Sequence, residues 1–541
     1  MKLRQVLEGV RLRSPLSPDL AEKAVAGIEY DSRRVGKDFV FFAFAGSRVD
    51  GRRFVEDAAA GGAFAFVSEL AAPEGVPDSI ATRWIQVEHG RQALATASRN
   101  FYRKPDERVL FTGITGTNGK TTTSYLADAI LQEAGFVTGL IGTIESRLAG
   151  ERRDVVNTTP ESLDVMRFAA ELEQRGAVLS EAAGGAPRCA LTMEVSSHAL
   201  ALGRVFGIRF HTAVFTNLTR DHLDFHHTMD QYAAAKARLF APVDSPGPLW
   251  SVLNADDPAS SGMAIANHAA QRTLWYGLSD TAHIRAHGGA LLRAESIFSS
   301  FAGLRFDLIY EGARQHIESA LTARFNVMNI LAAAGVGISY GIDLDTIARG
   351  IAACRSVPGR FERIDQGQPF LVTVDYAHTD AALRNAIQVA RELVTPTQIG
   401  GKLARGRVIT LFGCGGDRDR TKRPLMGMAA GELSDYVVLT SDNPRSEDPL
   451  DIMNDALVGL GRFDTPHVVE PDRAKAIRHA IEQAAAGDAV LIAGKGHETY
   501  QVLKDRTIHF DDRETAREVL RAIGYEVPGF KEPGGGSRES E

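Results

Sequence analysis

The sequence is poor in cysteine and has no long run of purely apolar residues. Its three cysteines, Cys189, Cys354 and Cys414, lie far apart among 541 residues. So few and such widely spaced cysteines exclude a disulfide framework and a cysteine-based zinc site. The first fourteen residues carry charges every few positions, which is unlike a signal peptide. These absences predict a protein of the reducing cytoplasm.

The longest uncharged stretch, residues 325–342, is the segment that could be interpreted as a membrane-spanning helix. It contains two asparagines and three glycines. A membrane span would be more uniformly apolar, so the stretch predicts a helix buried in a protein core and no membrane insertion.

The sequence also has fewer basic than acidic residues. The chain has 61 Lys and Arg against 68 Asp and Glu, giving a net charge of −7. This balance argues against binding nucleic acid through bulk charge. The hydrophobic fraction of 44% and charged fraction of 24% are typical of globular proteins. Glycine is the one excess, with 52 residues, which predicts many tight turns or backbone-lined loops.

The order of apolar runs predicts an α/β protein. The first hundred residues predict a small α/β unit, and Lys104-Pro105 marks a plausible boundary after a helix near 90–102. Strands then alternate with helices, which favours mostly parallel, doubly wound sheets. The segment 272–320 has a more antiparallel character. The expected strands are 38–46, 63–67, 108–114, 189–195, 212–217, 249–255, 370–376, 407–413, 436–441 and 489–494.

The length predicts roughly three domains of about 100–200 residues each. We expect a smaller N-terminal α/β domain over 1–106 and a central phosphate-loop ATPase-like domain with a doubly wound sheet over 107–355. A Rossmann-like C-terminal domain should follow over 356–530. The low-complexity end, 531–541, predicts a disordered tail.

The strongest local signal is a glycine loop between an apolar strand and a helix. It comprises Gly116, Thr117, Asn118, Gly119, Lys120, Thr121 and Thr122. Such a loop closes backbone N–H groups around phosphate, a lysine reaches the β/γ-phosphates, and a threonine hydroxyl can hold Mg²⁺. Ile114 stands where the strict pattern has glycine, so the loop is a variant. An ATPase motor, a GTPase and a ligase all remain open, although the absence of an Asn-Lys-x-Asp motif disfavours the GTPase.

Three further positions carry possible chemistry. Glu194 ends an apolar strand, where a carboxylate could hold Mg²⁺ or cap a loop. His222 and His226 stand four residues apart, a spacing that zinc sites use, but no third ligand is evident. Lys236 lies on an alanine-rich helix, and the residues alone favour a solvated lysine there.

Together these segments resemble the Mur ligase family, the ATP-dependent amide ligases of cell-wall precursor synthesis. The resemblance spans nearly the whole chain, with its motifs in family order. They are TGTNGKTTT (115–123), NTTPES (157–162), MEVSSHAL (193–200), TNLTRDHLDFH (216–226), YAAAKARLF (232–240), FNVMNILAAA (325–334), VDYAHT (374–379), GCGGDRDRTKRPLM (413–426), SDNPR (441–445) and AGKGHETYQ (493–501).

The resemblance implies roles in nucleotide and metal binding. Glu194 and His222 match residues that hold Mg²⁺, together with Thr121 of the loop. Lys236 matches a lysine that CO₂ converts to a carbamate, which helps to bind a second Mg²⁺. The matches for the nucleotide are Asn326, Asn329, Arg360 and Asp375.

The resemblance also implies where a UDP-N-acetylmuramoyl dipeptide would bind. Asp31-Ser32 and the loop Ser47-Arg48-Val49 match the uridine-binding part. The matched muramoyl-dipeptide positions are Asn157, Thr158, Thr159, Ser196, Leu202 and Arg204. Position 202 is glutamine in some family members and leucine here, and VDYAHT is followed by Asp380-Ala381 instead of the usual Pro-Asp.

The family divides chiefly on whether meso-diaminopimelate or L-lysine is added. The two differ by one distal carboxylate, which calls for a cation, preferably a planar bidentate one. Arg445 supplies it within a diaminopimelate-type tetrapeptide. The matched amino-acid contacts are Arg418, Asp442, Asn443, Pro444, Arg445, Gly494 and Glu498. A solvated surface loop remains open for Arg420, Lys422 and Arg423.

The implied activity joins meso-diaminopimelate to UDP-N-acetylmuramoyl-L-alanyl-D-glutamate through an acyl phosphate, using ATP and Mg²⁺. The expected protein is monomeric, without nucleic-acid partners. The L-lysine-adding variant is one alternative. A folylpolyglutamate-synthase-like ligase should lack the uridine domain and DNPR. A catalytically silent nucleotide-binding protein should not retain Lys120, Glu194, His222 and Lys236.

Overall fold

A computed structural model describes residues 1–46, 49–155, 157–182, 188–242, 247–266, 272–279, 289–394, 396–399 and 402–526. The chain folds as two units. The first comprises Met1–Ser296, Phe306–Ile317 and Val327–Ala353, and the second comprises Ile297–Arg305, Glu318–Asn326 and Cys354–Glu541. The expected tail, 531–541, lies outside the described residues, so its disorder stays a prediction. The domain boundaries expected from the sequence also stay predictions.

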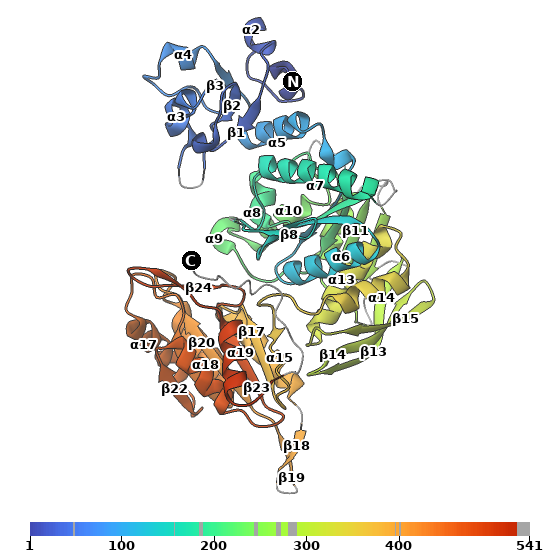
Figure 1. Cartoon of the computed structure of the whole chain (residues 1–541), viewed down its shortest axis with the longest axis vertical. Helices are drawn as coiled ribbons and strands as arrows, with labels where there is room; N and C mark the ends of the chain where they lie inside the picture. The colour runs from blue at the N-terminus through green and yellow to red at the C-terminus, as the bar shows by residue number, and fades with distance from the viewer. Residues whose placement is uncertain are drawn as a thin grey trace, which may run out of the picture. The chain divides into compact units, whose positions relative to one another are not determined.

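The first unit begins with a small parallel sheet in the order β1-β2-β3-β4. Its strands are short and almost wholly buried, because helices cover both faces (Figure 1). The elements are α1 (Leu3–Val6), α2 (Pro18–Ala21), β1 (Gly27–Glu29), η1 (Ser32–Arg34), β2 (Phe39–Phe42), η2 (Gly51–Phe54), α3 (Val55–Ala60), β3 (Ala63–Ser68), α4 (Asp78–Ala81), β4 (Trp84–Gln86), α5 (Gly90–Phe101) and η3 (Pro105–Glu107).

An eleven-stranded sheet follows, in the order β15-β14-β13-β12-β11-β10-β5-β9-β6-β7-β8. The strands from β12 to β6 pair in parallel, whereas β6, β7 and β8 pair antiparallel. The strands are β5 (Leu110–Thr115), β6 (Val137–Ile141), β7 (Ser146–Leu148), β8 (Glu151–Arg153), β9 (Cys189–Glu194), β10 (Phe210–Phe215), β11 (Trp250–Asn254), β12 (Arg272–Tyr276), β13 (Leu291–Ser300), β14 (Gly303–Tyr310) and β15 (Ala313–Ser319).

Alternation along β5 divides the core of this sheet into two layers. Phe111 joins a cluster that includes Leu172 and Leu239. Thr112 faces the other way, where the Tyr340 hydroxyl lies 2.9 Å from its Oγ1. The helices of this region are α6 (Lys120–Glu133), α7 (Ser162–Ala182), α8 (Ser197–Leu202), α9 (Leu223–His226), α10 (Met229–Ala237), α11 (Ser260–Ala266), α13 (Phe325–Ser339) and α14 (Leu344–Ala353).

The second unit contains a six-stranded sheet in the order β16-β17-β23-β20-β21-β22, parallel except for β16. Apolar clusters fill both of its faces. Its strands are β16 (Glu362–Arg363), β17 (Leu371–Asp375), β20 (Val408–Cys414), β21 (Tyr436–Ser441), β22 (His467–Glu470) and β23 (Ala489–Ala493). Two hairpins, β18 (Pro396–Ile399) with β19 (Lys402–Arg405) and β24 (Tyr500–Val502) with β25 (Thr507–His509), lie outside it. The helices are α15 (Asp380–Leu393), α16 (Lys422–Leu433), α17 (Pro449–Leu460), α18 (Arg473–Glu482) and α19 (Asp512–Ala522).

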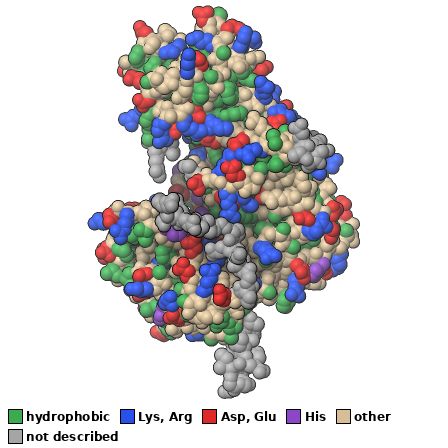
Figure 2. Space-filling view, in the orientation of Figure 1, with side chains coloured by type: hydrophobic (Ala, Val, Ile, Leu, Met, Phe, Trp, Pro, Cys, Tyr) green, Lys and Arg blue, Asp and Glu red, His purple; other side chains and the backbone are tan. Residues whose placement is uncertain are grey.

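The α/β fold with mostly parallel sheets is confirmed. Residues 325–342 form the buried helix α13 over most of their length, as predicted. In the described part of the chain, no helix combines the length and apolarity that a membrane crossing requires. On the face shown in Figure 2, basic and acidic side chains are interspersed.

Two features of the topology differ from expectation. The antiparallel strands β7 and β8 escaped prediction, because Ser146–Leu148 and Glu151–Arg153 are three residues each and largely polar. The segment 272–320 was expected to be antiparallel, but its first pair, β12 with β13, is parallel.

Candidate active site

The glycine loop lies where the sequence predicts it, between β5 and α6. Gly116 (φ 151°) and Gly119 (φ 84°) adopt backbone conformations that L side chains rarely take. A Cβ at Gly119 would lie 2.3 Å from Asn329 Oδ1, and one at Gly116 would lie 1.8 Å from Thr216 Oγ1. At both positions glycine is therefore needed for two reasons: other residues rarely adopt this backbone conformation, and there is no space for a side chain. The loop ends at the N-terminus of α6, where a helix favours anions.

Lys120 is the first residue of α6, and its side chain curls back over the loop. Its Nζ donates to the carbonyl oxygens of Gly116 at 2.9 Å and Thr117 at 2.8 Å. The ammonium is thereby held at the loop, where phosphate oxygens would bind.

Glu194 at the end of β9 is completely buried. Its Oε2 accepts hydrogen bonds at 3.0 Å from Thr121 Oγ1 and from Thr143 Oγ1, and its Oε1 accepts one from the Thr143 backbone N–H at 2.8 Å. The carboxylate therefore stands beside the phosphate loop, next to the threonine hydroxyl expected at Mg²⁺. One or two carboxylates with substrate phosphates are the usual Mg²⁺ environment, so these oxygens fit that ion.

Lys236 on α10 is not the solvated lysine that the residues alone favoured. Its side chain is 1% exposed, and its Nζ donates to the Gly116 carbonyl at 2.8 Å. It also lies over the Tyr232 ring, 4.5 Å from the centroid. Burial and the nearby Lys120 charge lower the pKa of Lys236 well below its ordinary value. The correction follows from packing, since an alanine-rich helix face can equally well lie inside the protein.

His222 and His226, the two histidines four residues apart, lie in different environments. His222 precedes α9 with a left-handed backbone (φ 52°), and burial lowers its pKa. His226 is buried, and its Nε2 lies 2.9 Å from Ser197 Oγ. Within the described ranges no group of three His, Cys, Asp or Glu side chains is arranged to hold a metal ion.

The positions matched to the muramoyl dipeptide gather beside Glu194. Thr159 Oγ1 donates to the Glu194 carbonyl at 2.9 Å and accepts from the Ser196 N–H at 3.0 Å. Arg204 Nη1 donates to the Thr159 carbonyl at 3.0 Å, and its Nε lies 3.1 Å from Glu161 Oε1. Thr158 Oγ1 lies 3.2 Å from Thr143 Oγ1.

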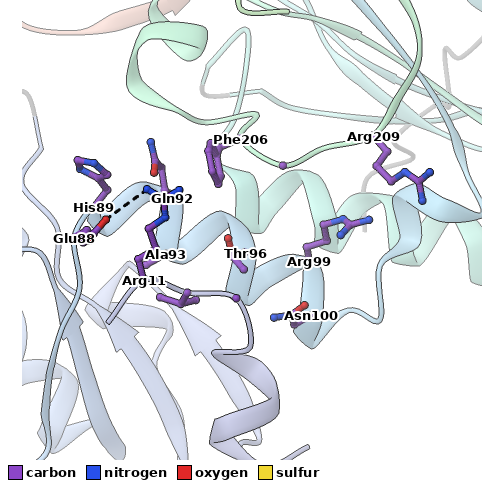
Figure 3. A pocket seen from close by; sticks show the side chains of 13 residues that line it. Arg11, Glu88, His89, Gln92, Ala93, Thr96, Arg99, Asn100, Phe206 and Arg209 are labelled. Carbon is purple, nitrogen blue, oxygen red and sulfur yellow. Dashed lines mark ion pairs between the residues drawn. The ribbon is translucent and has the colours of Figure 1, made fainter. Parts of the chain in front are cut away.

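The remaining positions of this set are less informative. Asn157 and Val49 are exposed, Ser32 begins η1, and Leu202 ends α8. Ser47 and Arg48 lie outside the described residues. A cavity of about 330 Å³ in the first unit is lined by α5 and the loop 206–209, including Gln92, Thr96 and Phe206 (Figure 3). It contains none of the predicted site residues.

The two asparagines of α13, Asn326 and Asn329, are buried. Asn329 packs against Gly119, as the short distance above shows. Asn326 Nδ2 donates to the Thr322 carbonyl at 2.6 Å.

In the second unit, Arg360 and Asp375 lie close to the rings of Tyr376 and His497. Asp375 ends β17 and accepts a hydrogen bond from the Phe361 N–H at 2.7 Å, while burial raises its pKa. The Arg360 guanidinium lies over the Tyr376 ring, 5.2 Å from its centroid. The Tyr376 ring also lies against His497, with centroids 4.9 Å apart. Burial, followed by the Arg360 charge, lowers the pKa of His497 to about 4.

The amino-acid positions meet at the carboxyl edge of the same sheet. Asn443 Nδ2 donates to Glu498 Oε2 at 2.8 Å. Gly494 (φ 117°) packs so closely that a Cβ there would lie 2.6 Å from Asp442 Oδ2. Arg445 also has a positive φ of 54°, and its Nη1 donates to the Gly416 carbonyl at 2.7 Å. Pro444 is buried and Arg418 is exposed.

The structure decides the alternative that was left open for Arg423, and it adds one residue to the site. Arg423 is 1% exposed and pairs with Glu447 at 2.7 Å and Asp455 at 2.9 Å, so it is a buried anchor. Arg420 stays exposed, paired with Asp455. Lys495, which sequence reasoning missed, is completely buried between Asn443 and Glu498. The signal that could have found it is its place inside the glycine-rich GKGHE segment.

Fold and loop together define a phosphate-loop nucleotide-binding α/β protein. Three family models match the chain: the Mur ligase family catalytic domain over 24–102, the Mur ligase middle domain over 114–337 and the Mur ligase glutamate ligase domain over 359–496. The chain belongs to the Mur ligase family, and the three-domain α/β architecture is that of this family.

Curated relatives resemble it along their whole length. The UDP-N-acetylmuramoyl-L-alanyl-D-glutamate–2,6-diaminopimelate ligase of Solibacter usitatus is 59% identical, over 97% of this chain and 99% of the relative. The Geobacillus thermodenitrificans ligase of the same name is 42% identical, over 92% and 95%. A solved structure of a ligase with this name aligns with a TM-score of 0.67 and 31% identity, covering 97% of this chain and 99% of the other.

Proposed function

We propose that this chain is the ATP-dependent ligase that joins meso-diaminopimelate to UDP-N-acetylmuramoyl-L-alanyl-D-glutamate, releasing ADP and phosphate. The observation that carries the proposal is the 59% identity, over nearly the full length of both chains, to a relative named for this reaction. The local residues agree with it, because Arg445 lies within DNPR and Glu498 lies in the same side-chain network.

The reaction proceeds in two covalent steps. An oxygen of the D-glutamyl side-chain carboxylate attacks the γ-phosphorus of ATP, the bond to the ADP oxygen breaks, and an acyl phosphate forms. The diaminopimelate amine then attacks the acyl carbon, loses a proton and expels phosphate. Lys120 and the loop N–H groups are suited to offset charge on the transferring phosphoryl group.

Each set of residues has a proposed part. Gly116, Thr117, Asn118, Gly119, Thr121 and Thr122 cradle the phosphates, while Asn326, Asn329, Arg360 and Asp375 contact the nucleotide. The UDP-dipeptide contacts are Ser32, Ser47, Arg48, Val49, Asn157, Thr158, Thr159, Ser196, Leu202 and Arg204. The diaminopimelate contacts are Arg418, Asp442, Asn443, Pro444, Arg445, Gly494 and Glu498.

Thr121, Glu194 and His222 would hold Mg²⁺, and Lys236 would add oxygen ligands as its carbamate. Mg²⁺ supplies charge neutralisation for phosphoryl transfer when it is bound. Burial of Lys236 beside a carbonyl oxygen supports the carbamate, because an uncharged amine is the form that attacks CO₂. The proposal also includes action in the cytoplasm as a monomer.

The L-lysine-adding variant is the second candidate, and Arg445 disfavours it. A guanidinium facing an amino acid without a distal carboxylate would lose its partner. A folylpolyglutamate synthase of Mycobacterium tuberculosis shares the fold, with a TM-score of 0.51 at 18% identity. That identity supports the fold alone.

Phosphate release tests the proposal. The full chain is mixed with ATP, Mg²⁺ and the UDP-dipeptide, and meso-diaminopimelate, L-lysine or no amino acid is added. We expect sustained release only with diaminopimelate. Release with lysine alone would favour the second candidate, and no release with either would contradict the ligase assignment.

A further inference from the structure

Lys495 lies just beyond the carboxyl end of β23, in the turn that leads to β24. Its side chain is completely buried, although a lysine ammonium is almost never fully buried without partners. None of the roles assigned above uses it. A buried cation at the edge where the amino acid is proposed to bind therefore needs an explanation.

The ammonium has an acceptor for each of its three protons. Nζ donates to Glu498 Oε2 at 3.2 Å, to Asn443 Oδ1 at 3.3 Å and to the Tyr500 carbonyl. Three donors meeting three acceptors is a fully satisfied arrangement. Two of these acceptors belong to residues proposed to contact the amino acid.

This arrangement fixes the Asn443 side chain. Because Lys495 and the Val502 N–H both donate to Oδ1, the amide nitrogen must face the other way. There Nδ2 donates to Glu498 Oε2 at 2.8 Å. The orientation of the amide is thus set by its neighbours on both sides.

The same contacts leave Glu498 with one occupied oxygen. Oε2 accepts from both Lys495 and Asn443, whereas Oε1 accepts no hydrogen bond from the described part of the chain. A carboxylate held in this way presents Oε1 to an incoming ammonium group. The network also reaches Arg445, whose Nη1 lies 3.4 Å from the Asn443 carbonyl.

We propose that Lys495 is a positioning residue for the amino-acid substrate: it holds Asn443 and Glu498 in the geometry that receives the ammonium end of diaminopimelate. This inference rests on the proposed function. Lys495 acts through its two neighbours and does not itself touch the substrate.

The test compares Lys495→Met with the full-length parent in steady-state ligation. We expect KM for diaminopimelate to rise at least tenfold, while KM for ATP and for the UDP-dipeptide stays within twofold. Lys495→Gln keeps hydrogen bonding without charge and should give a smaller rise. If Lys495→Met does not fold, Lys495→Gln carries the test with a threefold rise as the threshold.

A matched control removes a different cation from the same sheet. Arg407 lies just before β20, and its guanidinium pairs with the buried Asp488 at 2.8 Å, at the opposite end of β20 and β23. Arg407→Met should lower thermal stability and leave all three KM values within twofold.

A double variant separates positioning from general damage. If Lys495 acts through Glu498, adding Lys495→Met to Glu498→Gln should raise KM for diaminopimelate less than threefold further. An unchanged KM in Lys495→Met, or equal rises for all three substrates, would overturn the inference. Failure of the parent chain to ligate diaminopimelate would instead contradict the proposed function.

Discussion

Lys236 beside the phosphate loop and Lys495 at the carboxyl edge of the second sheet are both almost completely buried, and their surroundings differ sharply. Lys236 donates to a single carbonyl, lies near the Lys120 charge and has a lowered pKa. Lys495 meets a carboxylate, an amide oxygen and a carbonyl. The comparison teaches that burial alone does not assign a role. A poorly partnered amine is suited to become a nucleophile, and a fully partnered ammonium is suited to hold other groups in place.

The largest expected effect tests the phosphate-loop side of this comparison. Lys120→Ala should reduce ligation by about 10³-fold or more, because it removes the cation at the transferring phosphoryl group. Acyl-phosphate formation, trapped as the hydroxamate, is the measurement. Unchanged turnover would show that the loop lysine does not act on the γ-phosphate.

The next effect addresses the two lysines directly. Lys236→Ala should lower kcat by about 10²–10³-fold, the scale of losing one group that stabilises transition-state charge. Carbon-13 NMR of the protein equilibrated with labelled bicarbonate should show a carbamate signal in the parent. The signal should vanish in Lys236→Ala and persist in Lys495→Met. A signal that instead depends on Lys495 would reverse the comparison.

A smaller effect is expected at Arg445, the cation proposed to bind the distal carboxylate of diaminopimelate. Arg445→Ala should reduce the preference for diaminopimelate over lysine by about 1–3 kcal/mol, because a distal carboxylate loses its partner. Competition between the two amino acids measures this preference. Equal losses with both would contradict a role in selecting the carboxylate.

The smallest effect is on stability. His497 has a pKa of about 4 in the folded chain, below its ordinary 6.5, so the unfolded chain binds more protons between these values. The free energy of unfolding therefore falls as the pH drops from 6.5 toward 4, by about 1 kcal/mol per pH unit, and it is unaffected by His497 above pH 6.5. Denaturant unfolding at several pH values should show a flatter profile for His497→Gln. If the unfolding free energy of His497→Gln falls as steeply with pH as that of the parent, other residues cause the acid sensitivity.

The sequence predicted the strands well, because parallel strands buried on both faces read as apolar runs such as 436–441, which is β21. It also located the phosphate loop, since glycines at 116 and 119 are needed there. It could not show that Lys236 is buried, because an alanine-rich face suits either solvent or core. It missed Lys495 for a related reason: a lysine usually faces water, and one of the groups that hold it inside the protein, the Asn443 side chain, comes from a segment 52 residues away.

The most direct test of the account is the mass of the product formed when diaminopimelate and L-lysine compete. The full chain is incubated with ATP, Mg²⁺, the UDP-dipeptide and equal concentrations of both amino acids. The account predicts that the UDP-tripeptide carries diaminopimelate, with one ADP formed per tripeptide. A product carrying lysine, or ATP hydrolysis without any tripeptide, would contradict it.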